Sequence, residues 1–212
     1  MPGPVGWTVW TPAIAPVGVV YCLHGYQATH RFAFDDIHLH EIPGNLVLAS
    51  VDGGPDSYWH ARADGSDAMA MLLDEFVPFV EANVPPLPRA LLGWSMGGYG
   101  SLLVASTVPE RFRAVAVASP ALWTSAGQTA PGAFDDAGDY ARHDVFALTA
   151  HLAHTPIRLD CGYRDPFVSA DKKFAAALST PPEGEFGRGG HDPGYWRSVA
   201  PAQLAFLTSS LS

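Results

Sequence analysis

Positive charge, cysteine and long apolar runs are all scarce in this chain of 212 residues. Its 12 Lys and Arg face 21 Asp and Glu, and the net charge of −9 repels nucleic-acid phosphates and anionic lipid surfaces. Its two cysteines, Cys22 and Cys161, fit neither a disulfide framework nor a zinc-ligand cluster, so we interpret both as small buried residues. No apolar run reaches the ~20 residues of a membrane span. We therefore expect no nucleic-acid partner and no membrane span.

The first thirty residues also lack the features of a secretory signal. The first positive charge is Arg31, and several prolines interrupt any apolar stretch before it. This pattern predicts a cytoplasmic protein. The prolines are Pro2, Pro4, Pro12 and Pro16.

Apolar residues, in contrast, are abundant, at 48% against 16% charged, which predicts one globular domain over residues 1–212 that folds by core burial. The 21 Gly and 19 Pro separate short apolar runs, which we interpret as strands. Strands are predicted at 5–10, 18–23, 46–51, 90–92, 114–118 and 157–160, and helices at 66–84, 97–107, 144–152 and 169–178, with a last helix after Asp192-Pro193. This alternation predicts an α/β fold on a mostly parallel sheet, with its ligand site at the carboxyl ends of the strands.

The run Gly93-Trp94-Ser95-Met96-Gly97 follows a predicted strand and precedes a predicted helix. This is the context of a nucleophile elbow, in which a sharp turn exposes a serine hydroxyl and small neighbours prevent collisions. A plain glycine-rich turn with a helix-capping serine is the alternative. We predict Ser95 as the nucleophile.

A serine hydroxyl needs a base, and the order expected after such an elbow is serine, then Asp or Glu, then histidine. His191 follows two glycines and precedes the last helix, where this fold carries its general base. Asp165 lies in a turn beyond a predicted strand, from which a carboxylate can orient the imidazole, and Asp160 is its competitor. We predict Ser95, Asp165 and His191 as the catalytic triad.

An oxyanion in the intermediate requires two preorganised N–H donors. One is expected from Met96, which follows the nucleophile, and the other from Tyr26, with Gly25 as the alternative. His24 either orients this loop or is an ordinary turn residue.

These motifs resemble the family called Putative esterase, a branch of the α/β hydrolases that includes the S-formylglutathione hydrolases (esterase D) and the antigen 85 mycolyltransferases. The resemblance covers about residues 19–196 and its most specific part is the Ser-Met-Gly-Gly-Tyr-Gly run at 95–100. It implies an α/β-hydrolase fold and the same triad and oxyanion donors. It rests on Leu23-His24-Gly25, Asp52-Gly53-Gly54, Ser57-Tyr58-Trp59, the run at 93–100, Asp160-Cys161-Gly162, Asp165-Pro166-Phe167, Gly190-His191 and Tyr195-Trp196.

The chain is shorter than these relatives, which predicts a minimal fold without a lid domain and an open site that prefers short-to-medium acyl groups. The antigen 85 proteins have an Asp at the position of His24 and a Glu as the acid, so mycolyl transfer is not expected here. Substrate contacts are predicted for His24, Gly25, Tyr58, Trp59, Trp94 and Tyr195, with Trp123 as a further aromatic candidate.

The leading hypothesis is a carboxylesterase that acts on a small-molecule ester without metal or cofactor. Transfer of the acyl group to a sugar or other alcohol and thioester cleavage use the same acyl-enzyme, and the sequence does not separate them. A non-catalytic binding module is a third alternative, and a metal enzyme built on His38 and His40, with His30 or His60, is a fourth. The oligomeric state is open between monomer and homodimer.

Overall fold

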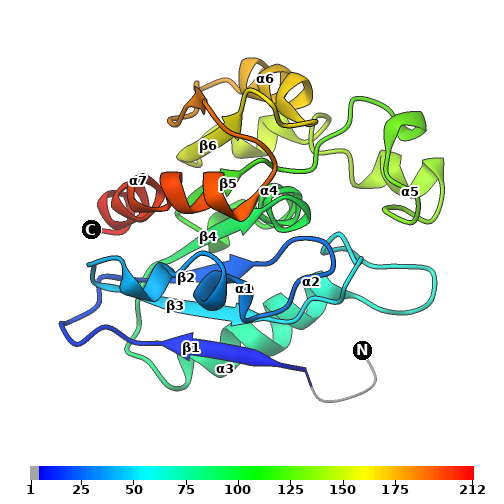
Figure 1. Ribbon diagram of the computed structural model, residues 1–212. Coiled ribbons are helices and arrows are strands. Elements are labelled where there is room, and N and C mark those ends of the chain that lie inside the picture. Colours follow the sequence, from blue (N-terminus) through cyan, green and yellow to red (C-terminus); the bar gives the residue numbers. More distant parts are fainter. Residues whose placement is uncertain (1–4) are drawn as a thin grey trace.

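The computed structural model describes residues 5–212 and has a central sheet of seven strands with helices on both faces (Figure 1). The strand order is β1-β3-β2-β4-β5-β6-β7, and every neighbouring pair is parallel except β1 with β3. The strands are β1 (Trp7–Trp10), β2 (Gly18–Leu23), β3 (Leu46–Val51), β4 (Arg89–Trp94), β5 (Ala114–Ala118), β6 (Ile157–Gly162) and β7 (Phe186–Gly187).

The helices connect these strands and cover the sheet. They are α1 (Phe32–Asp35), α2 (Ala68–Ala70), α3 (Val77–Glu81), α4 (Met96–Thr107), α5 (Ala137–Arg142), α6 (Val168–Ala177) and α7 (Pro193–Leu211). Short 3-10 turns occupy Leu39–Glu41, Pro109–Arg111, Ala126–Gln128 and Thr149–Leu152. Within residues 5–212 no helix has the length and apolar character to cross a bilayer, and there is no separate lid domain.

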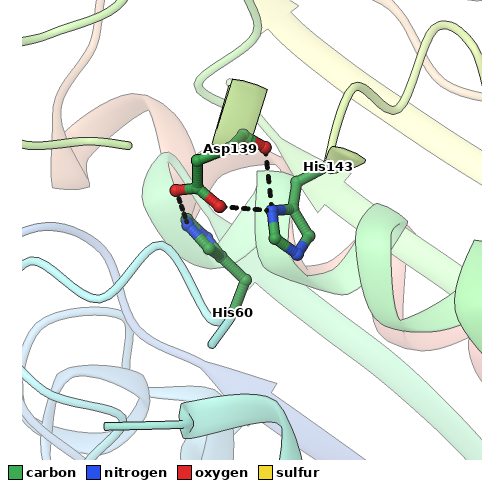
Figure 2. A group of neighbouring side chains, drawn as sticks. All are labelled: His60, Asp139 and His143. Carbon is green, nitrogen blue, oxygen red and sulfur yellow. Dashed lines mark hydrogen bonds and ion pairs between the residues drawn. The ribbon is translucent and has the colours of Figure 1, made fainter. Parts of the chain in front are cut away.

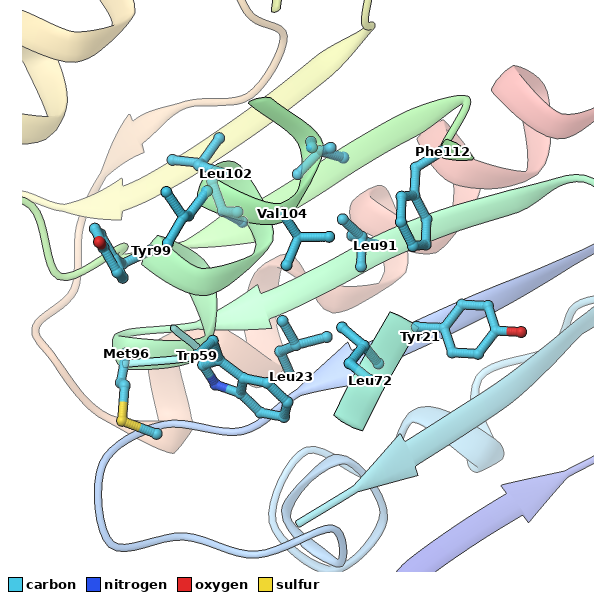
Figure 3. Packing of buried hydrophobic residues seen from close by; sticks show 14 of the residues in the cluster. Tyr21, Leu23, Trp59, Leu72, Leu91, Met96, Tyr99, Leu102, Val104 and Phe112 are labelled. Carbon is cyan, nitrogen blue, oxygen red and sulfur yellow. The ribbon is translucent and has the colours of Figure 1, made fainter. Parts of the chain in front are cut away.

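The hydrophobic core consists of two clusters, one on each face of the sheet, because successive side chains of a strand point to opposite faces. Tyr21 and Leu23 of β2 pack beneath α4 and the helical segment from α2 to α3, as Figure 3 shows. Val20 and Cys22 of the same strand lie on the other face with α1 and α7. Both faces of β2 are therefore buried, which explains its continuous apolar run.

The predicted helix 66–84 is a continuous helical segment over the shorter range 68–81, and its middle part, Met71–Phe76, is a π-helix. The N–H of Val77 donates to the carbonyl of Leu72, five residues back. Pro78 follows directly, and a proline ring crowds the carbonyl four residues before it in a regular helix. The wider turn accommodates Pro78.

Several other elements also differ from the sequence-based prediction. The prediction of a helix at 144–152 is wrong, because this range contains no α-helix and only a 3-10 turn at Thr149–Leu152. The short elements α5 and β7 were not expected. Helix α6 begins at Val168, one residue before the predicted start, and no side chain caps it. In contrast, Asp192 caps α7 as expected, because its side chain accepts the N–H of Tyr195.

Candidate active site

Ser95 lies at the bend between β4 and α4, in a backbone conformation that L-residues rarely adopt (φ 53°, ψ −117°). Neighbouring backbone leaves no room for a side chain at Gly93 or Gly97, which lie two residues before and two residues after Ser95. A Cβ on Gly97 would lie 1.9 Å from the carbonyl oxygen of Leu23, and one on Gly93 would lie 2.1 Å from that of Gly97. The two glycines therefore allow the bend that presents the serine.

A substitution tests this requirement. Gly97→Ala is expected to lower the free energy of unfolding by at least about 1–3 kcal/mol, because the new methyl group overlaps rigid backbone. Urea denaturation measures the change. Gly127→Ala is the matched control, since nothing lies within 4 Å of its added Cβ. Equal stabilities of the two variants would contradict the steric account.

Ser95, His191 and Asp165 form a hydrogen-bonded series. The Nε2 atom of His191 lies 2.9 Å from the Oγ atom of Ser95, and its Nδ1 atom lies 2.9 Å from the Oδ2 atom of Asp165. Asp165 is buried, and its Oδ1 atom accepts the N–H of Phe167 at 2.9 Å. The imidazole therefore has one nitrogen toward a hydroxyl and the other toward a carboxylate that the backbone holds in place.

The segments that carry Asp165 and His191 are fastened to one another by backbone hydrogen bonds. The N–H of Tyr163 donates to the carbonyl of Gly187 at 2.7 Å, and that of Arg164 donates to the carbonyl of Gly189 at 3.0 Å. Close packing at Gly162 adds to this, because a Cβ there would lie 2.4 Å from Gly189. The loop before α7 is thereby held beside the end of β6.

Asp160 has different partners. Arg158 donates to both of its carboxylate oxygens at 2.9 Å, Gln203 donates at 3.1 Å, and the N–H of Glu185 donates at 3.1 Å. Burial raises the pKa of Asp160, and the hydrogen bonds and the charge of Arg158 oppose that shift. Asp160 is therefore a structural carboxylate, and Asp165 is the one that faces His191.

The loop after β2 lies against the serine. A Cβ on Gly25 would be 3.4 Å from the carbonyl oxygen of Trp94 and 3.5 Å from the Cβ of Ser95. The N–H of Gln27 donates to the carbonyl of Pro55 at 2.7 Å, which ties the loop to the segment after β3. Met96 is the first residue of α4, so its N–H has no acceptor four residues back within that helix. Met96 thus directly follows Ser95, and the loop that carries Tyr26 approaches the serine at the preceding residue, Gly25.

The family model for Putative esterase matches residues 4–207. The chain belongs to this family. It is 32% identical over 154 residues to a pimeloyl-[acyl-carrier protein] methyl ester esterase of Neisseria meningitidis, covering 65% of this chain and 54% of the relative. The chain thus spans about half the length (54%) of that curated relative.

Solved structures share the fold of this Putative esterase chain over nearly its whole length. A ferulic acid esterase matches with a TM-score of 0.83 and 21% identity, over 97% of this chain and 93% of that one. An S-formylglutathione hydrolase from Agrobacterium tumefaciens matches with a TM-score of 0.78 and 18% identity, over 97% and 90% of the two chains. The predicted α/β-hydrolase fold is confirmed.

His24 of this esterase-family chain orients the loop that approaches Ser95. Its Nδ1 atom lies 2.8 Å from the carbonyl oxygen of Gly25, and its Nε2 atom accepts the N–H of Gly53 at 3.0 Å. The ring is therefore neutral and protonated on Nδ1. Both nitrogens are used within the chain and the residue is 1% exposed, so the ring holds the loop in place, and the predicted substrate contact of His24 stays a prediction.

Burial lowers the pKa of His24, opposed by its hydrogen bond to Gly25 and by the charge of Asp52, while His30 adds to the lowering. Below about pH 6.5 the unfolded chain binds a proton at this histidine that the folded chain does not, so stability falls as pH falls. We expect His24→Asn to be less stable than wild type at pH 7 but to lose less stability between pH 7 and 5.5. Urea denaturation at both pH values measures this. If wild type and His24→Asn lost the same free energy of unfolding between pH 7 and 5.5, His24 would not contribute to the pH dependence of stability.

The aromatic residues predicted to contact substrate are mostly buried, and their contact with substrate stays a prediction. Trp59 and Trp94 are both 0% exposed. Trp59 lies in the core cluster on one face of the sheet, and Trp94 lies in the cluster on the other face. Tyr58 and Tyr195 are also buried, at 5% each. Trp123 is the exception, since it is partly exposed and lines an open groove of about 480 Å³.

Phe167 connects this groove to His191, which does not itself line the groove. Phe167 forms one wall, and its ring centroid is 5.3 Å from that of His191 and 5.6 Å from that of Trp123. Trp196 contacts the imidazole as well, with centroids 5.0 Å apart. No role was predicted for Phe167 or Trp196 from the sequence, although the position of Phe167 two residues after Asp165 indicated that it lies near the triad.

The histidines expected for the alternative metal enzyme, His38 and His40 with His30 or His60, do not form one cluster. His38 pairs with Glu41, whereas His30 lies 3.2 Å from the hydroxyl of Thr8. Among residues 5–212, the only group of three or more potential metal ligands contains His60 but neither His38 nor His40.

Proposed function

We propose that this chain hydrolyses carboxylic esters with short-to-medium acyl groups through a covalent acyl-enzyme on Ser95. The observation that carries the proposal is the position of His191, whose two ring nitrogens each lie 2.9 Å from a partner, the hydroxyl of Ser95 and the carboxylate of Asp165. This geometry suits a general base and its orienting acid. Membership of the Putative esterase family supports the same chemistry.

In the first half of the reaction, the Oγ atom of Ser95 attacks the ester carbonyl carbon while the Nε2 atom of His191 takes the hydroxyl proton. The carboxylate of Asp165 accepts the Nδ1–H of the resulting imidazolium and stabilises its charge. The backbone N–H groups of Met96 and Tyr26 donate to the oxyanion. His191 then gives its proton to the departing alkoxide, and the alcohol leaves.

In the second half, a water molecule attacks the acyl carbon as His191 takes a proton from it, and the tetrahedral intermediate expels Ser95, which regains the proton. The open groove lined by Phe167, whose ring also contacts His191, is our candidate for the acyl subsite. Trp123 and Phe167 provide apolar walls, and its volume of about 480 Å³ suits an acyl group of limited length.

A panel of p-nitrophenyl esters graded by acyl length tests this function, with wild type and Ser95→Ala compared on each ester. The expected result is activity on short and medium acyl groups that disappears in the variant. A strong rise in rate beyond about ten carbons would contradict the proposed acyl subsite. Equal rates of wild type and variant would contradict the proposed function itself.

Thioester cleavage is a second candidate, because solved structures with this fold include an S-formylglutathione hydrolase. The same acyl-enzyme forms from a thioester. Comparing kcat/KM for matched oxygen esters and thioesters separates the two substrate classes. Adding alcohol acceptors to the assay tests acyl transfer, since new ester with little free acid would identify a transferase.

A further inference from the structure

A second group of polar side chains, outside the proposed triad, lies between the loop after β3 and the α5 segment (Figure 2). It consists of His60, Asp139 and His143, whose potential ligand atoms all lie within 4.8 Å of one another. His60 and Asp139 are each 1% exposed, and the side chain of His143 is 21% exposed. Nothing in the proposed ester chemistry uses these residues.

The contacts of His60 are unusual for a neutral imidazole. Its Nδ1 atom lies 3.2 Å from the carbonyl oxygen of Tyr58, and its Nε2 atom lies 3.2 Å from the Oδ2 atom of Asp139. Both partners are acceptors, whereas a neutral ring has only one N–H. If Nδ1 donates to the backbone carbonyl, the lone pair of Nε2 faces a carboxylate. Metal-ligating histidines show this arrangement, with one nitrogen donating to a backbone carbonyl and the other directed at the ion.

His143 approaches the same carboxylate from the other side. Its Nδ1 atom is 3.0 Å from the Oδ1 atom of Asp139 and 3.0 Å from the carbonyl oxygen of that residue. The ring centroids of His60 and His143 are 4.4 Å apart, and Figure 2 shows the carboxylate of Asp139 reaching both rings. Two imidazoles thus converge on one carboxylate.

The spacing of these atoms is close to that of a zinc coordination shell. Ligands bound at about 2.0–2.1 Å in a tetrahedral arrangement lie about 3.3 Å from one another. The two nitrogen-to-carboxylate distances are 3.2 and 3.0 Å. Small side-chain shifts, with the proton of the His143 ring moved from Nδ1 to Nε2, therefore suffice to place an ion among the three residues.

We propose that His60, Asp139 and His143 bind one divalent transition-metal ion, with zinc as the best match. Two imidazole nitrogens and one carboxylate favour zinc over magnesium or calcium, which take mainly oxygen ligands. The N–H of Asp135 donates to Asp139 at 2.9 Å and holds the carboxylate in place.

The surroundings provide access to this site and room for a further ligand. A cavity of about 390 Å³ is lined by His60 and His143 and also by Asp67 and Asp74, whose carboxylates attract cations. A water molecule from this cavity completes a four-coordinate ion. Arg142 donates to Asp139 at 3.2 Å, and its largely exposed side chain can leave when the ion binds.

The proposed ion joins two segments that are 79 residues apart in the sequence, at His60 and Asp139. It therefore stabilises the folded chain, because the unfolded chain does not hold these ligands together. This role is independent of the proposed esterase function.

Zinc titration of chelator-treated protein tests the proposal, with calorimetry for stoichiometry and thermal unfolding for stability. We expect one Zn²⁺ per chain and a rise in Tm of several degrees at saturation. His143→Ala, which alters the more exposed ligand, should weaken binding at least about tenfold. His60→Ala should do the same if it folds, which circular dichroism checks. With Co²⁺ in place of Zn²⁺, wild type should show the visible absorption of a four-coordinate ion.

His38→Ala is the matched control, because it removes a half-exposed histidine of the His38-x-His40 pair. It should bind zinc as wild type does. The proposal is overturned if wild type binds no zinc, if His143→Ala binds as tightly as wild type, or if only the control loses affinity. Displacement of zinc by equimolar Mg²⁺ or Ca²⁺ would contradict the assignment of nitrogen ligands.

Discussion

Ser95→Ala is expected to lower kcat for a short-chain ester about a million-fold, the loss seen when a nucleophile that works as one unit with its base is removed. The fold should remain, because alanine fits the same bend and only one oxygen, 2.9 Å from His191, is lost. Steady-state kinetics with a p-nitrophenyl ester measure the effect. Circular dichroism and urea denaturation confirm that the variant is folded.

Ser106→Ala is the control for this experiment. Ser106 is also buried and lies on α4, where its hydroxyl donates to the carbonyl of Leu103 at 2.9 Å, remote from any proposed chemistry. Its kcat should equal that of wild type. A Ser95→Ala variant that retained more than about one hundredth of the wild-type kcat would be incompatible with an acyl-enzyme on Ser95.

Asp165→Asn is the second large effect, with an expected fall in kcat of about ten-thousand-fold. The carboxylate accepts the Nδ1–H of His191 at 2.9 Å and so keeps the Nε2 atom free to take a proton from Ser95. An amide in its place can donate to Nδ1, which favours the tautomer with the proton on Nε2. Kinetics on the same ester measure the loss.

Asp160→Asn separates this role from the general effect of changing a buried carboxylate. Arg158 and Gln203 donate to Asp160, so its neutralisation should lower the free energy of unfolding by up to about 3 kcal/mol and leave kcat nearly unchanged. If Asp160→Asn lost more kcat than Asp165→Asn, Asp160 would be the acid that orients His191 and Asp165 the structural carboxylate, which would contradict our assignment.

Local sequence was sufficient to predict the central strands. The bounds of β2, β3 and β5 agree with the predicted ones, because each is a continuous apolar run buried on both faces. The short elements α5 and β7 gave no comparable pattern. β7 has only two residues, and it is a strand because Cys161 and Gly162 of β6 pair with it. Such elements depend on partners far away in the sequence.

Sequence prediction was less complete for side-chain environments. Chain order and position pointed to Ser95, Asp165 and His191, which the structure brings together. Burial of Trp59 and Trp94 depends on the direction in which each side chain packs, and local sequence does not specify that direction. The group of His60, Asp139 and His143 also has no local motif, because it forms only when α5 packs against the loop after β3.

Site mapping with a fluorophosphonate probe tests the central claim most directly, since such probes phosphonylate only an activated serine. Intact-mass spectrometry and peptide mapping after brief labelling should show one adduct, located on Ser95, and its formation should be far slower in His191→Ala. An adduct on another serine, or equal labelling rates of wild type and His191→Ala, would contradict the account.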